Sequence, residues 1–101
     1  MKKFTFAFYG EPKFDNPENG NRYMEKWKAW ERGLSEVLPV TPLARSKIVS
    51  PGAILDEGGP NRLTGFSIVK ADSLDAAVKI AMACPHLEHG TIHVGEVMEM
   101  K

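Results

Sequence analysis

The chain has 101 residues, 43% hydrophobic and 26% charged, which is typical of one globular domain and excludes a disordered segment. Its 13 basic and 13 acidic residues cancel, so no overall field favours nucleic acid or an anionic membrane as a partner. The single cysteine excludes an internal disulfide framework, and no apolar run is long enough to cross a bilayer, so we expect a cytoplasmic protein.

The first predicted element is a strand over residues 4–9. Phe4, Phe6 and Phe8 alternate with smaller or polar residues, a period of two that is typical of a half-buried strand. We expect the phenylalanine face to meet the helices. Two lysines precede this run, but the run is too short for a secretory signal, and Gly10 ends it. Residues 10–20 are rich in Pro, Asn and Gly and predict a loop.

A helix is predicted next, with its apolar face over residues 23–38. Asn16-Pro17-Glu18 offers an N-cap, a first-position proline and an acidic first turn, whereas Gly20 and Asn21 leave the start open by several residues. Its apolar residues recur at steps of four, three, four and three: Tyr23, Trp27, Trp30, Leu34 and Val37. We expect both tryptophans to anchor the core and Pro39 to end the helix. Residues 41–50 carry a weak strand signal, and Pro51-Gly52 and residues 56–61 predict turns or loops.

The second half of the chain repeats the strand and helix pattern. Residues 63–71 predict a strand, and Asp72 or Ser73 would cap a second helix that Pro85 ends. Residues 91–100 predict the last strand. The order β-α-β-β-α-β predicts a single α+β domain over residues 1–101, with a ferredoxin-like fold and a four-stranded antiparallel sheet.

Two helices on one face of such a sheet leave its other face uncovered. The period of two places Thr5, Ala7, Tyr9, His93 and Val97 there, and we also assign Ser67 and Val69 to this face. This surface is too apolar to be well solvated. A second copy of the chain covering it, which makes a homodimer, is the simplest solution.

The sequence resembles the YCII-related domain family, including its DGPF-type branch. The resemblance rests on residues 4–10, 65–69, 71–77 and 90–94. It implies a dimeric α+β barrel in which two ferredoxin-like sheets face one another. Some short members are thought to use a His-Asp pair with the histidine early in the first helix, but residues 23–38 contain no histidine. The DGPF tetrapeptide is absent as well. Related chemistry in the family includes removal of chloride from a chlorinated hydroquinone, a substrate that we do not transfer.

Reactive side chains gather between residues 84 and 93, and three interpretations compete. Cys84, His86, His89 and His93 are suitable zinc ligands, but their spacing is not a familiar zinc pattern. Cys84 as a nucleophile is disfavoured, because the C-terminal end of a helix opposes a thiolate. His93 as a general acid or base is the third, with Tyr9 as its neighbour on the first strand. A hydrogen-bonded interface role for His93 remains an equal alternative.

These residues lead to a function hypothesis and two alternatives. The hypothesis is a cofactor-independent, metal-free enzyme for a compact aromatic or carbonyl-bearing metabolite, with His93 and Tyr9 as catalytic residues in the dimer cavity. Arg62, Asn61 and His86 would bind the ligand, although a solvated loop arginine is the commoner outcome. The alternatives are a ligand-binding module without turnover and a structural dimerisation domain. No phosphate-binding or dinucleotide-binding fingerprint is present in the sequence.

Overall fold

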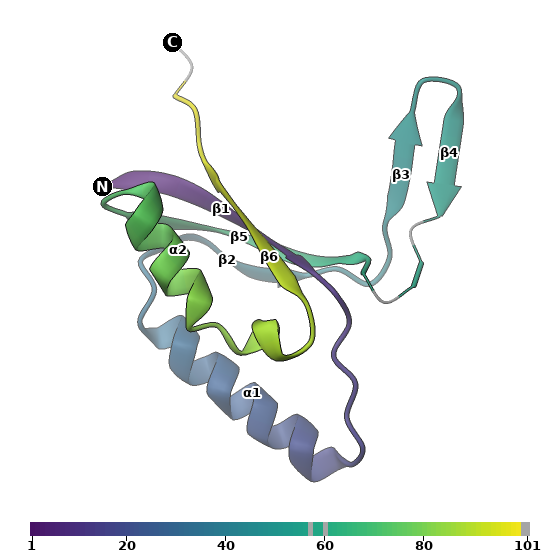
Figure 1. Ribbon diagram of the computed structural model, residues 1–101, viewed down its shortest axis with the longest axis horizontal. Helices are drawn as coiled ribbons and strands as arrows, with labels where there is room; N and C mark the ends of the chain where they lie inside the picture. The colour runs from purple at the N-terminus through teal and green to yellow at the C-terminus, as the bar shows by residue number, and fades with distance from the viewer. Residues whose placement is uncertain (57, 60, 100–101) are drawn as a thin grey trace.

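The computed structural model describes residues 1–56, 58–59 and 61–99. A four-stranded antiparallel sheet is covered on one face by two helices (Figure 1). The strands lie in the order β2 (Glu36–Pro42), β5 (Leu63–Ala71), β1 (Lys2–Tyr9) and β6 (Thr91–Glu96). The helices are α1 (Pro17–Arg32) and α2 (Leu74–Met82), and the short 3-10 helix η1 (Pro85–Glu88) leads into β6. This confirms the predicted α+β ferredoxin-like fold.

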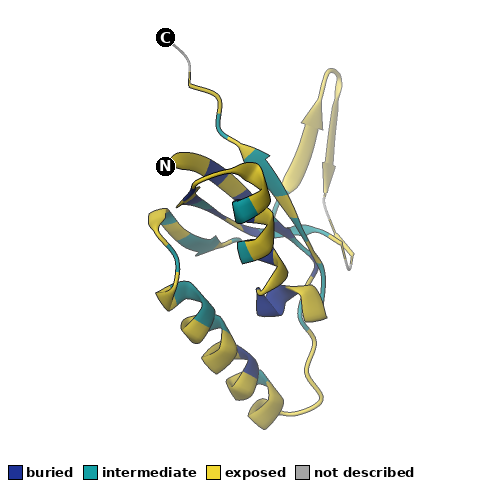
Figure 2. Ribbon diagram, turned by 60° about the vertical axis from the view of Figure 1, so that its left-hand side comes forward, coloured by how far each residue is buried: buried dark blue, intermediate teal, exposed yellow. Residues whose placement is uncertain are grey.

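The core lies between the sheet and the helices. Phe4, Phe6 and Phe8 of β1 point to this side and are buried, as predicted. Trp30 of α1 stacks on Phe6 with ring centroids 6.3 Å apart, and its Nε1 donates a hydrogen bond to the carbonyl oxygen of Ile80 in α2 at 2.9 Å. The tryptophan therefore joins both helices to the central strand. Figure 2 shows the buried residues gathered in this layer.

The first helix starts at the Asn16-Pro17-Glu18 capping signal but ends earlier than predicted. It begins at Pro17, because the Asn16 side chain accepts a hydrogen bond from the backbone nitrogen of Asn19 at 2.9 Å. It ends at Arg32 rather than at residue 38, and residues 36–42 form β2. Pro39 is tolerated in this strand because β2 lies at the edge of the sheet and its pairing with β5 is irregular.

The second half follows its prediction more closely. β5 has the predicted bounds, and Ser73 caps α2 by accepting from the backbone nitrogen of Ala76 at 3.1 Å. β6 ends at Glu96, earlier than expected, and Met100 lies outside the described residues. Neither of the helices in the described part of the chain is long and apolar enough to span a membrane.

A β-hairpin absent from the prediction follows β2. Its strands are β3 (Lys47–Ser50) and β4 (Ala53–Asp56), and the predicted turn at Pro51-Gly52 joins them with Gly52 at φ 78°. In Figure 1 this hairpin stands away from the main sheet, on the side opposite α1 and α2.

The uncovered sheet face differs from its prediction on β5. Ser67 and Val69 are fully buried on the helix side, because they pair with Phe6 and Phe4 of β1. Residues directly opposite in a sheet share a face, so Phe66 and Ile68 take the uncovered side. We call this surface the open face; it is formed by Thr5, Ala7, Tyr9, Phe66, Ile68 and His93.

Candidate functional site

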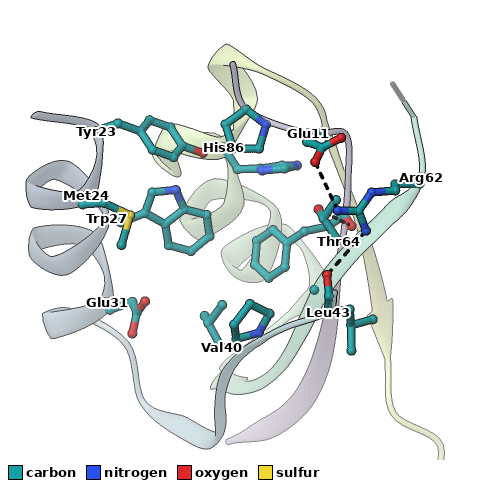
Figure 3. Close-up of a pocket in the computed structure, with 14 residues that line it drawn as sticks. Glu11, Tyr23, Met24, Trp27, Glu31, Val40, Leu43, Arg62, Thr64 and His86 are labelled. Carbon is teal, nitrogen blue, oxygen red and sulfur yellow. Dashed lines mark hydrogen bonds and ion pairs between the residues drawn. The ribbon is translucent and has the colours of Figure 1, made fainter. Parts of the chain in front are cut away.

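A pocket of about 410 Å³ opens between α1 and one end of the sheet, on the helix side (Figure 3). Apolar side chains form most of its wall, among them Phe8, Tyr23, Met24, Trp27, Val40 and Leu43. The polar side chains that line it are Glu11, Glu31, Arg62, Thr64 and His86. An apolar cavity of this size with a few convergent polar groups has the character of a small-molecule site.

Tyr23 is part of this wall, and its hydroxyl is buried. The hydroxyl has no hydrogen-bond partner among the described residues, although its interaction with the side chain of Trp27 opposes part of the effect of burial on its pKa. Burial raises the pKa of the Tyr23 phenol. The rings of Phe14 and His89 pack against Tyr23 with centroids 5.1 and 4.9 Å away and hold it in place. Figure 3 shows the hydroxyl directed from α1 toward His86.

His86 lies on η1 at the opposite side of the pocket and is only 3% exposed. Its Nε2 lies 2.8 Å from the carbonyl oxygen of Tyr9. Since a carbonyl can only accept, Nε2 carries the proton and Nδ1 is an acceptor in the neutral ring. Burial lowers the pKa of His86, which favours this neutral form near pH 7. Its imidazole can therefore act as a proton acceptor.

Charged groups stand at the rim and at the base. Arg62 Nη2 lies 3.3 Å from Glu11 Oε1, and Arg62 Nη1 donates to the carbonyl oxygen of Leu43 at 3.4 Å. The predicted ligand-binding arginine thus reaches the pocket with a carboxylate already beside it. Glu31 of α1 lines the base, and burial, followed by the charge of Glu36, raises the pKa of its carboxyl.

The five residues predicted as one site are divided by the sheet. Tyr9 and His93 are neighbours, as the alternation of side chains along the strands predicted, and their ring centroids are 4.4 Å apart. Both lie on the open face, away from the pocket. His93 is exposed there, on the edge strand β6. His86 and Arg62 line the pocket on the helix side, and Asn61 sits exposed in a turn without lining it. The catalytic role of His93 and Tyr9 stays a prediction.

The four residues considered as zinc ligands also separate. Cys84 is buried in the core, whereas His93 lies on the other face of the sheet. Within residues 1–56, 58–59 and 61–99, no group of three or more His, Cys, Asp or Glu side chains is placed to hold a metal ion.

The thiol of Cys84 is expected to be inert in the folded protein. Burial raises its pKa to about 12, so almost no thiolate forms near neutral pH. A thiol-specific colorimetric reagent at pH 8 should leave the native protein unlabelled and react with one thiol per chain in urea. Ser35→Cys, which adds an exposed thiol, is the matched control and should react at once. Rapid labelling of native Cys84 would contradict this expectation.

Tyr23 and Glu31 were not predicted as functional residues. Tyr23 was counted as part of the apolar face of the helix, and its hydroxyl gave no separate signal. A signal for Glu31 does exist: it follows Trp27 by four residues, which places a carboxylate on the apolar face of α1. A charged group there is unusual for a face that meets only a hydrophobic core.

The model of the YCII-related domain matches residues 5–101 of the sequence. The chain belongs to the YCII-related domain family. The chain shows no significant match to any curated protein. A solved structure that matches is the 5-chloro-2-hydroxyhydroquinone dehydrochlorinase TftG from Burkholderia phenoliruptrix AC1100, in complex with 2,5-dihydroxybenzoquinone. It is 16% identical with a TM-score of 0.47, and the match covers 97% of this chain and 95% of that chain.

Proposed function

We propose that this YCII-related protein is a small cofactor-independent enzyme that acts on a compact aromatic or carbonyl-bearing metabolite in the pocket beneath α1. One observation carries the proposal: an unpaired buried hydroxyl, Tyr23, and a buried neutral imidazole, His86, line the same aromatic-walled cavity. The rings of Phe8 and Trp27 line the pocket, and aromatic surface of this kind favours an aromatic ligand. The volume suits a molecule with one ring.

The chemistry follows from the two polar groups. The Tyr23 hydroxyl donates a hydrogen bond to a carbonyl or phenolic oxygen of the ligand, which satisfies a group that is costly to leave unpaired. His86 accepts a proton from the ligand at Nδ1, while its Nε2 keeps its proton and donates a hydrogen bond to the Tyr9 carbonyl oxygen, which fixes the ring. Arg62 at the rim attracts a ligand that carries negative charge, with Glu11 as its partner in the free protein.

A second candidate site is the open face, where the rings of Tyr9 and His93 are in contact. We propose that two copies of the chain pair through this face, because its centre is formed by Ala7, Phe66 and Ile68. Phe66 is 37% exposed in the single chain. In that homodimer Tyr9 and His93 would face the partner, as an acid/base pair or as interface contacts. A cavity there would require the partner, whereas the α1 pocket exists in one chain.

Replacing Tyr23 and Tyr9 by phenylalanine separates the two sites. In titrations with hydroquinone and 4-hydroxyacetophenone followed by protein NMR, Tyr23→Phe should weaken binding about tenfold, the effect of one lost hydrogen bond. Tyr9→Phe is the matched control and should leave the affinity unchanged. The reverse pattern would place the site on the open face. Equal binding by both variants and the unaltered protein would contradict a functional hydroxyl at either position.

Turnover is tested on the same ligands. Of the two, 4-hydroxyacetophenone is a methyl ketone. An acid/base enzyme should exchange the methyl hydrogens of this ligand for deuterium in D₂O faster than buffer alone does. This exchange should fall in Tyr23→Phe, because the hydroxyl stabilises the developing enolate oxygen. Binding without exchange would favour the ligand-binding module instead of the enzyme.

A further inference from the structure

The β3–β4 hairpin has apolar side chains on both of its faces. Ile48 pairs with Leu55 and Val49 pairs with Ile54, so each pair occupies one face. The exposed fractions of these four residues are 46%, 57%, 74% and 68% in the same order. An ion pair between Lys47 and Asp56, with 3.0 Å between Nζ and Oδ1, closes the base. Four large aliphatic side chains are therefore exposed on two strands of four residues each.

Such a hairpin is unstable when it stands alone. In the described part of the chain β3 and β4 pair only with each other and form a separate two-stranded sheet. An isolated two-stranded hairpin is at best marginally stable in water, and it becomes stable when an apolar face packs against another element. Neither α1 nor α2 covers it in Figure 1. Its sequence therefore suits a surface that another molecule buries.

The position of the hairpin indicates which surface this is. In Figure 1 it rises from the side of the sheet opposite α1 and α2, which is the side of the open face. The hairpin therefore stands on the side to which the open face is turned. A molecule seated on Phe66 and Ile68 of the open face would meet the hairpin at its side.

We propose that the β3–β4 hairpin is a dimerisation arm, with which each copy of the chain embraces a second copy seated on its open face. This goes beyond the proposed enzymatic function and depends only on the pairing of open faces. Its length fits: four residues at about 3.3 Å span about 13 Å, and two facing sheets pack about 10 Å apart. The arm can therefore cross the gap and reach the partner's sheet.

The area also favours a second copy over the open face alone. Four strands spaced by about 4.8 Å and about 25 Å long present roughly 480 Å². Stable dimers bury about 800 Å² of accessible surface on each partner, so additional buried area favours a stable dimer. Two arms related by two-fold symmetry add such area with apolar side chains. The formal net charge of zero leaves no overall repulsion between the copies.

Sedimentation velocity across a range of protein concentrations tests the arm. The unaltered chain should be a dimer at micromolar concentration. Val49→Ser/Ile54→Ser and Ile48→Ser/Leu55→Ser each remove one apolar face, and at least one of them should raise the dimer Kd about a hundredfold. Met82→Ser, which removes an exposed apolar side chain from α2, is the control and should leave the Kd unchanged.

Hydrogen exchange provides a second measurement that does not need a variant. Amides of residues 47–56 should exchange slowly above the dimer Kd and quickly below it, while those of β1 stay protected at both concentrations. A chain that is monomeric at all concentrations would overturn the proposal, including the case in which the arm binds another protein. A dimer that both arm variants leave intact but Phe66→Ser dissociates would overturn the arm and keep the open-face pairing.

Discussion

Gly90→Ala is expected to destabilise the protein by about 3 kcal/mol or more, because a buried Cβ has no space there. A Cβ at this position would overlap the carbonyl oxygen of Tyr9 and lie 2.8 Å from His86 Nε2. Both are parts of the hydrogen bond that fixes the His86 ring, and the carbonyl belongs to the central strand β1. Neither the Tyr9 carbonyl nor the His86 ring can make room for this Cβ unless the sheet or η1 moves.

Urea denaturation followed by tryptophan fluorescence measures this loss. Gly58→Ala is the matched control, since an added Cβ there meets no atom within 4 Å, and its free energy of unfolding should change little. Gly90→Ala should also weaken ligand binding in the pocket, because His86 must turn or shift. A loss below about 1 kcal/mol would show that the close approach of Tyr9, His86 and Gly90 is wrong.

The second large effect is expected for Phe8→Ala, at about 3 to 5 kcal/mol. Phe8 is buried, and its ring packs against Trp27, Trp30 and His86 with centroids 5.3, 6.4 and 5.4 Å away. The variant loses the burial of an aromatic ring and leaves a cavity where core and pocket meet. The same urea experiment measures the loss, and the pocket should become larger and bind one-ring ligands more weakly.

Phe66→Ala is the comparison on the other face of the same sheet. Phe66 is 37% exposed, so at protein concentrations low enough to give monomers it should lose only about 1 kcal/mol. Phe8→Leu keeps most of the apolar volume and should lie between the two. Equal losses for Phe8→Ala and Phe66→Ala in the monomer would contradict the assignment of the two phenylalanines to opposite faces.

The pocket shows why a site can escape a reading of the sequence. Its polar groups come from the loop after β1, from α1, from the residues before and within β5, and from η1, which are far apart in the chain. The sequence analysis selected Arg62 and His86, since a guanidinium and an imidazole are common ligand-binding groups. It could not show that Tyr23 has no hydrogen-bond partner, because that depends on what surrounds the hydroxyl after folding.

The sequence by itself determined the elements with strong local signals. The alternating phenylalanines set the inner face of β1, and the capping signal at Asp72 or Ser73 set the start of α2 to within one residue. The order of these elements, with the rule that β1 is central, placed Tyr9 beside His93. Local periodicity is sufficient here, because a strand sends alternate residues to opposite faces whatever surrounds it.

Only the tertiary structure decided the rest. Leu34 fits the helical spacing of Trp27 and Trp30, yet it packs against the core from beyond the end of α1. Spacing alone cannot distinguish a residue within the helix from one just after it. Ser67 and Val69 lie on the helix side because strand pairing fixes register, and a shift of one residue reverses every side chain. The sheet also separates His86 from His93, since seven residues of chain can cross from one of its faces to the other.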